Sequence, residues 1–375
     1  MEMTTEQRAF FELVKSGLWG TEADAGAFDS RTDWPSLYRC GKNQAMLGVM
    51  LDGIGRLPES LRPPRALYLQ WCASVMHTEE NNHKLNAEIG RLCTLLRAEG
   101  IEPVLLKGQG VAQNYPEPLH RQCGDIDIYI GMADFERVNR LLSGDGYEAA
   151  EARVHHCTFT WHGIGVENHR ILTQMNSPCA TRRLQRWVDS WHGTARAPQV
   201  DIEGCRVMVP PVEFDAVFVL QHAVHHLLGT GVGLRQVCDW ACLLHSRRAT
   251  IDRAAVAREL RRLHLVGSAR AFGALAVRYL GLPAEDLPVE LSESDMPLGD
   301  WLLEDIWSSG NFGRGDSERK PRPKGYWSGK WHTFVTVLSR GFKLWRLAPV
   351  ETLWLPYSMI SNLLSVRLYM LRRRS

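Results

Sequence analysis

Residues 124–130 read Gly-Asp-Ile-Asp-Ile-Tyr-Ile and are the most informative part of the sequence. Side chains alternate between the two faces of a strand, so Asp125 and Asp127 are expected to lie side by side. The three isoleucines would then point the other way, into an apolar core. Adjacent carboxylates repel each other, and aspartate is not favoured in strands. The simplest reason for such a pair is a divalent cation, and Mg²⁺ prefers oxygen ligands from protein, water and phosphates.

The composition is that of an ordinary globular protein. The chain has 375 residues, of which 45% are hydrophobic and 23% charged. Its net charge of +2 creates no whole-molecule field that would recruit nucleic acid. The 9 cysteines are odd in number and include no CxxC pair, which argues against a structural zinc site and favours free thiols.

The sequence shows no targeting or membrane-spanning segment. The N-terminal stretch is acidic and amphipathic, unlike a signal peptide. No run of about eighteen apolar residues occurs, so we expect no transmembrane span. These features predict a cytoplasmic location.

The predicted fold class is α+β, with a small mixed sheet flanked by helices and an all-helical C-terminal region. Residues 1–79 are predicted to form an N-terminal helical region, with helices at 5–16 and 43–54; a longer helix covers 66–99. Residues 80–210 are the predicted α+β core. Its expected elements are strands at 103–106, 125–130, 200–202 and 206–209, helices at 108–114 and 133–142, and a hairpin at 154–170 that turns at His162-Gly163.

The pattern changes after Pro210-Pro211. Residues 211–312 are predicted to be a helical domain, with helices at 213–228, 234–245, 251–263 and 266–280. Residues 313–325 read as a charged Gly/Pro linker, and 326–375 as C-terminal helices that end with an amphipathic stretch at 357–374. That stretch suits packing onto the helical domain, and its apolar and arginine residues also suit a membrane surface.

Lys107-Gly108-Gln109-Gly110 is the candidate phosphate-binding element. A helix that begins here would offer free backbone N–H groups and the positive end of its dipole. Lys107 would add a charge, and Gly108 and Gly110 would let a triphosphate approach the backbone. The motif is weak by itself, because glycine often only begins a turn. An ordinary strand-end role for Lys107 stays open.

Glu167 is the candidate for a third carboxylate. It alternates with apolar neighbours and shares a strand face with His169, so a strand beside 125–130 would bring it to the aspartates. Clustered carboxylates can hold two Mg²⁺ ions and activate an attacking hydroxyl in phosphoryl or nucleotidyl transfer. Asp201, on another strand-like stretch, is the reserve candidate.

These motifs together resemble the polymerase-beta-like nucleotidyltransferase superfamily, and most closely its uncharacterised bacterial branch. The resemblance rests on Lys107-Gly108, Arg121, Gly124-Asp-Ile-Asp and Val166-Glu-Asn-His, and on a helical signature at 231–240 with an Arg and an Asp after a His-rich helix. It spans roughly residues 80–245. The superfamily usually has Gly-Ser where this chain has Lys107-Gly108.

The resemblance implies a nucleotidyltransferase-type sheet and a set of site residues. Asp125, Asp127 and Glu167 would be the catalytic and metal-binding residues, with two Mg²⁺ ions expected. Glu167 would also assist deprotonation of the acceptor. The implied nucleotide-binding residues are Lys107, Gly108, Gly110, Arg121 and Gly124. For Arg121, a plain loop charge and a partner of the aspartate pair both stay open.

The expected function is transfer of a nucleoside monophosphate from an NTP to an unidentified acceptor. Two alternatives remain open. One is a non-catalytic binding subunit of the same fold in a biosynthetic cluster. The other is a helical metallohydrolase that uses His222, His225, His226 and Asp239. For that group, core histidines and a helical Arg235–Asp239 ion pair are the simpler interpretation.

Overall fold

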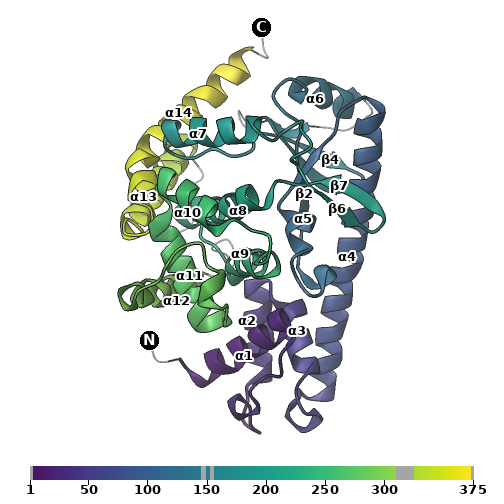
Figure 1. The fold of residues 1–375 in the computed structure, drawn as a ribbon, viewed down its shortest axis with the longest axis vertical. Helices are drawn as coiled ribbons and strands as arrows, with labels where there is room; N and C mark the ends of the chain where they lie inside the picture. The colour runs from purple at the N-terminus through teal and green to yellow at the C-terminus, as the bar shows by residue number, and fades with distance from the viewer. Residues whose placement is uncertain (1–2, 145–148, 153–155, 310–324, 373–375) are drawn as a thin grey trace.

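The structure is a computed structural model that describes residues 3–144, 149–152, 156–309 and 325–372. A β-sheet lies between one long helix, α4, and a large group of helices (Figure 1). The predicted α+β class, with its mixed sheet and all-helical C-terminal region, is confirmed. None of the helices in these ranges is both long enough and apolar enough to cross a bilayer.

Four helices form the N-terminal region: α1 (Thr5–Trp19), α2 (Trp34–Gln44), α3 (Leu47–Gly55) and α4 (Arg65–Ala98). The side chains of Thr4 and Gln7 form a capping box at the start of α1. The helix predicted at 43–54 was wrong at its start, because residues 43 and 44 belong to α2. Ala45 adopts a left-handed conformation with φ of 56° and separates α2 from α3.

The sheet has seven strands in the order β3-β4-β5-β2-β1-β7-β6. Their bounds are β1 (Val104–Leu106), β2 (Asp125–Tyr129), β3 (Ala149–Ala152), β4 (His156–Trp161), β5 (Ile164–His169), β6 (Gln199–Ile202) and β7 (Cys205–Met208). The pairs β2–β5 and β1–β7 are parallel and the others antiparallel. The sequence had predicted every strand except β3.

The hairpin of β4 and β5 turns where the sequence predicted. His162 and Gly163 both have positive φ, of 47° and 82°. Two such residues make the tight turn whose twist matches that of the flanking strands. This turn fixes the register of β5, and with it the face to which Glu167 points.

One face of the sheet packs on α4 and on α6 (Phe135–Gly144). Ile126, Ile128 and Ile130 are at most 3% exposed and belong to the apolar core between the sheet and these helices, as predicted. Leu85, Ile89, Leu92 and Leu96 supply the α4 side of this core at helical spacing. The carboxylates of β2 and β5 are therefore left for the opposite face.

The remaining helices build the rest of the molecule around a second, larger core. They are α5 (Gly108–Ala112), α7 (Pro178–Asp189), α8 (Val212–Gly229), α9 (Leu234–Ser246), α10 (Arg253–Arg262), α11 (Val266–Leu280), α12 (Met296–Ser309), α13 (Tyr326–Lys343) and α14 (Pro349–Arg372). α14 begins eight residues before the amphipathic stretch expected from residue 357. The predicted linker at 313–325 lies outside the described residues except for Gly325, the N-cap of α13. The nine cysteines are free thiols.

Candidate active site

The carboxylates of β2 and β5 lie opposite each other because these strands are parallel neighbours. In the register of the pair, Asp125 is opposite Gly165, Asp127 opposite Glu167, and Tyr129 opposite His169. The prediction that a strand carrying Glu167 lies beside 125–130 is confirmed. Asp201 is on the edge strand β6, three positions away from β2, where it is exposed. The geometry therefore favours Glu167 over Asp201 as the third carboxylate.

Asp127 is the most strongly bonded of the acids. Its Oδ1 is 2.8 Å from His169 Nε2 and 3.1 Å from Lys107 Nζ, and the residue is only 4% exposed. Burial by itself would raise the pKa of this carboxyl. The charge of Lys107 and the hydrogen bond from His169 outweigh burial and hold the pKa well below its usual range. Asp127 is therefore ionised.

Asp125 and Glu167 have the opposite electrostatic environment. Burial, followed by the charge of Asp127, raises the pKa of both carboxyl groups. Glu167 Oε2 is 3.6 Å from His169 Nε2, and Glu167 Oε1 is 4.0 Å from His156 Nε2. The cations nearby do not fully compensate the negative charge on this face, so a further cation would be stabilised here.

Asp127, Glu167 and His169 form a group with metal-ligand spacing. One ligand atom from each lies within 4.8 Å of the others. This is the only such group of three or more His, Cys, Asp or Glu residues in the described ranges. Asp125, two residues before Asp127 on the same strand, lies outside the group. The sequence analysis noted His169 only as a neighbour of Glu167 on the same strand face, although its spacing of two residues from Glu167 was a usable signal.

The backbone is strained where β1 ends and α5 begins. Lys107 has φ of 51° and Gly108 has φ of 40°. Residues other than glycine rarely adopt such a positive φ, so the strain falls on Lys107. A Cβ atom on Gly108 would lie 3.2 Å from Cys123 Sγ. This turn brings Lys107 back over β2 and onto Asp127. The helix that follows, predicted at 108–114, has only five residues, so its dipole is small.

A cavity of about 550 Å³ opens above the acids. Of the residues predicted to bind nucleotide, Lys107, Gly108 and Arg121 line this cavity, whereas Gly110 and Gly124 do not. Gly110 instead packs within α5, where an added Cβ would lie 3.3 Å from Val209. No sequence motif pointed to Thr173, Gln174 or Asn362, which also line the cavity.

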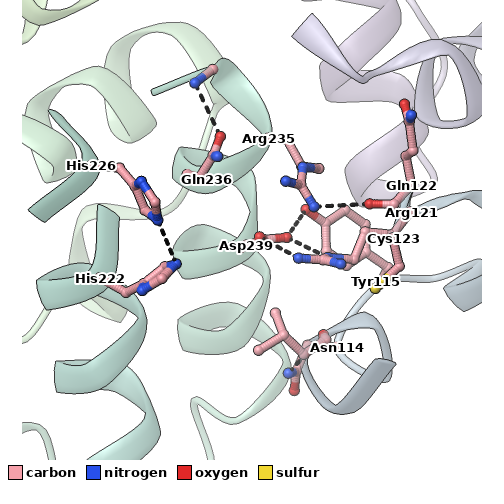
Figure 2. Close-up of polar contacts among 12 residues, drawn as sticks. Asn114, Tyr115, Arg121, Gln122, Cys123, His222, His226, Arg235, Gln236 and Asp239 are labelled. Atoms are coloured by element: carbon pink, nitrogen blue, oxygen red, sulfur yellow. Dashed lines mark hydrogen bonds and ion pairs between the residues drawn. The ribbon is translucent and has the colours of Figure 1, made fainter. Parts of the chain in front are cut away.

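Arg121 pairs with Asp239 of α9 and not with the aspartates of β2. Its Nε and Nη2 donate to the two oxygens of Asp239 at 2.8 and 2.7 Å, and Tyr115 Oη donates to Oδ1 at 2.7 Å (Figure 2). The interpretation of Arg121 as a partner of the aspartate pair is therefore wrong. So is the expected Arg235–Asp239 ion pair, since Arg235 Nη1 donates to the carbonyl of Gln122 instead.

The histidines of α8 form part of the opposite wall. His222 Nε2 and His226 Nε2 are 3.0 Å apart (Figure 2). Burial lowers the pKa of His222 well below its usual value and that of His226 to about 3, so both rings are neutral near pH 7. They serve as hydrogen-bonding groups. Because Asp239 holds Arg121, the proposed metallohydrolase group lacks its acidic ligand.

The comparison with protein families agrees with this geometry. A model described as "Uncharacterised nucleotidyltransferase" matches residues 30–281, about two thirds of the chain. The chain belongs to this nucleotidyltransferase family. The match runs from before α2 to the end of α11, so it extends beyond the span of roughly 80–245 that the motifs indicated. It includes both the acids of the sheet and the histidines of α8.

A solved structure also shows similarity. It is the crystal structure of an antigenic nucleotidyltransferase-like protein from Paracoccidioides brasiliensis, with 14% sequence identity and a TM-score of 0.32. The alignment covers 49% of this chain and 91% of that chain. Comparison with curated proteins finds no match.

Proposed function

We propose that the protein is a Mg²⁺-dependent nucleotidyltransferase that transfers a nucleoside monophosphate from an NTP to an acceptor and releases pyrophosphate. One observation carries this proposal: the register of β2 and β5, which sets Asp127 opposite Glu167 at the base of a cavity of about 550 Å³. A cavity of this size can hold a nucleotide. Membership of the nucleotidyltransferase family supports an NTP as substrate.

The acids suit magnesium. Asp125, Asp127 and Glu167 offer carboxylate oxygens, the ligand type that Mg²⁺ prefers. Burial and then the charge of Asp127 raise the pKa of Asp125 and Glu167, so a bound cation would stabilise the ionised form of both. We assign the ions to these three residues, with two ions expected. Bound Mg²⁺ would supply charge stabilisation for the attacking acceptor oxygen and the departing pyrophosphate.

The surrounding side chains have distinct roles in this proposal. Glu167, whose pKa is raised by burial and then by the charge of Asp127, accepts the proton of the acceptor hydroxyl. His169 orients both Asp127 and Glu167 through its Nε2. Lys107 has a flexible stem, so its ammonium group can turn from Asp127 to a phosphate oxygen.

The opposite wall supplies positive charge for the phosphates. Arg121 pairs with Asp239, and Arg235 lines the cavity as a second guanidinium group that donates to the backbone carbonyl of Gln122. Burial and then the charge of Arg121 lower the pKa of Arg235, so an anion beside Arg235 would stabilise its charged form. Arg235 Nε is also buried without a hydrogen-bond partner. A triphosphate between the acids and Arg235 would compensate this charge, while the neutral His222 and His226 would contact uncharged polar groups.

Label transfer tests the activity. The protein would be incubated with each of four α-³²P-labelled NTPs, Mg²⁺ and lysate fractions that supply the acceptor. Label should reach an acceptor with the wild type and be lost with EDTA. The variants Asp127→Asn and Glu167→Gln should lose at least about a hundredfold in rate. Asp201→Asn is the matched control, because this exposed acid is on the same sheet but away from the cavity. Undiminished transfer by Asp127→Asn would exclude the proposed chemistry.

A non-catalytic binding protein is the second candidate. The observation in its favour is that Asp127 already bonds to Lys107 and His169 within the protein. Isothermal titration separates the two functions. An enzyme of this class binds NTP in a Mg²⁺-dependent manner, and Asp127→Asn reduces that binding. A binding protein without catalysis shows no Mg²⁺-dependent NTP binding and no label transfer.

A further inference from the structure

Among the described residues, most of the large apolar side chains that are exposed to solvent lie near the C-terminal end of the chain. Nine of the twelve lie on α13, on α14 or in the turn between them. The other three, Leu69, Met76 and Met132, are scattered over α4 and the start of the α6 region. Scattered apolar residues are normal on a protein surface, whereas a concentrated group marks an interaction site.

These side chains form two stripes at helical spacing. On α13, Trp331, Val335 and Phe342 are 67%, 45% and 65% exposed, and their spacing of four and seven residues puts them on one side of the helix. On α14 the stripe consists of Leu353, Tyr357, Ile360 and Leu364, each more than half exposed. We call these seven residues the α13–α14 face. Both helices lie at the outer edge of the molecule, away from α4 (Figure 1).

The same segment carries a strong positive charge. Residues 326–375 contain eight lysines and arginines and one acid, Glu351. Glu351 is 4% exposed and accepts hydrogen bonds from the backbone N–H groups of Asn176 and Ser177, so it does not contribute to the surface. Arg340 and Lys343 both pair with Asp305 of α12, which offsets one of the eight positive charges. The whole chain has 44 basic and 42 acidic residues, so residues 1–325 contain 36 basic and 41 acidic residues. The near-neutral total thus conceals a negative body and a positive C-terminal segment.

We infer that the α13–α14 face binds the surface of an anionic phospholipid membrane. Aromatic side chains such as Trp331, Phe342 and Tyr357 suit the boundary between headgroups and acyl chains, and basic residues are attracted to anionic lipids. A second copy of the chain is a poorer occupant, because a symmetric dimer through this face would bring two positive segments together. Binding would be peripheral, since no described helix is suited to crossing a bilayer.

Membrane binding would also place the cavity near the lipid surface. Asn362 of α14 lines the cavity that holds the acids, so this helix belongs to both the site and the α13–α14 face. The inference stands on exposure and charge, independently of the proposed transferase activity. Vesicle binding can be measured without NTP or metal.

Flotation of the full-length protein with vesicles tests this inference. Vesicles of phosphatidylcholine alone are compared with vesicles that contain about 30% phosphatidylglycerol. We expect binding to the anionic vesicles, little binding to the neutral ones, and loss of binding at about 0.5 M salt. The double variant Phe342→Ser/Leu353→Ser should bind at least about tenfold more weakly. Arg346→Glu, at an exposed position in the turn after α13, should weaken binding about fivefold or more.

Matched controls separate a surface effect from misfolding. Leu69→Ser/Met76→Ser removes apolar side chains of similar exposure, 57% and 58%, from α4. Lys84→Glu reverses a charge at an exposed position of α4, which lies away from α13 and α14 (Figure 1). Both controls should bind vesicles like the wild type. Absence of binding to anionic vesicles would overturn the inference. The inference would also fail if the control variants lost vesicle binding to the same extent. It would fail as well if light scattering showed a dimer that Phe342→Ser/Leu353→Ser dissociates while vesicle binding persists.

Discussion

At the scale of single residues, one carboxylate governs the site. Asp127 is ionised because His169 and Lys107 both bond to its Oδ1. Burial and then the charge of Asp127 raise the pKa of Asp125 and Glu167. Asp125 and Asp127 therefore differ in pKa although both are aspartates on one face of the sheet. The difference arises because only Asp127 bonds to Lys107 and His169.

Arg235 offers a test of how phosphate is bound. Arg235→Gln should raise the KM for NTP about tenfold or more with a smaller effect on kcat, since the guanidinium would contact the triphosphate in both ground and transition states. Arg235→Lys keeps the charge and should recover part of the affinity. Steady-state kinetics at fixed Mg²⁺ measures both values. If Arg235→Gln leaves KM unchanged, this wall does not hold the phosphates.

His120 makes stability depend on pH in a defined direction. Burial would lower its pKa, but hydrogen bonds and charges from Asp52 and then Glu79 outweigh burial and raise the pKa from 6.5 to about 9. A raised histidine pKa stabilises the fold below about pH 6.5, and this contribution is lost as the pH rises through about 9. The free energy of unfolding of the wild type should therefore be about 2 kcal/mol higher than that of His120→Asn at pH 6. Urea unfolding should show the difference shrinking by pH 9.5; a constant difference would contradict this.

At the scale of elements, α1 and α3 approach each other backbone to backbone. A Cβ atom on Gly53 would lie 2.2 Å from the carbonyl oxygen of Leu13, and one on Gly17 would lie 1.9 Å from that of Val49. Gly53→Ala should therefore cost about 2 kcal/mol or more, because the two helices must separate. Gly55→Ala is the control in the same helix. Nothing lies within 4 Å of its added Cβ, so stability should hold or rise by about 0.5 kcal/mol. Equal effects in denaturant unfolding would refute the close approach.

At the scale of the whole molecule, a buried ion pair joins the sheet to the helical region. Arg121 precedes β2 and Asp239 lies on α9, and both are about 5% exposed. Asp239→Asn or Arg121→Met should each cost about 3 kcal/mol, because each leaves a buried group without its charged partner. The double variant should cost less than the sum, by at least about 1 kcal/mol. A urea double-mutant cycle with purely additive costs would show that the pair does not couple these parts.

The sequence alone determined the local geometry of the site. Alternation of Asp and Ile over residues 125–130 fixed which face carries the acids, and the His162-Gly163 turn fixed the register that exposes Glu167 on that face. Both depend on neighbours a few positions apart, and the backbone dictates their directions. The helices at 66–99, 213–228 and 266–280 were equally readable from apolar spacing, and the structure has them within a few residues. The domain boundaries proposed from the sequence stay predictions.

Tertiary structure decided the other side of the cavity. The partner of Arg121 is Asp239, 118 positions along the chain, whereas local spacing had suggested Arg235 as the partner of Asp239. Helical spacing reports which residues could meet on an isolated helix, but a buried carboxylate bonds to the donors that packing brings within reach. The placement of the α8 histidines opposite the acids has the same origin. Contacts between distant segments depend on how the two cores pack, and no short sequence pattern encodes that arrangement.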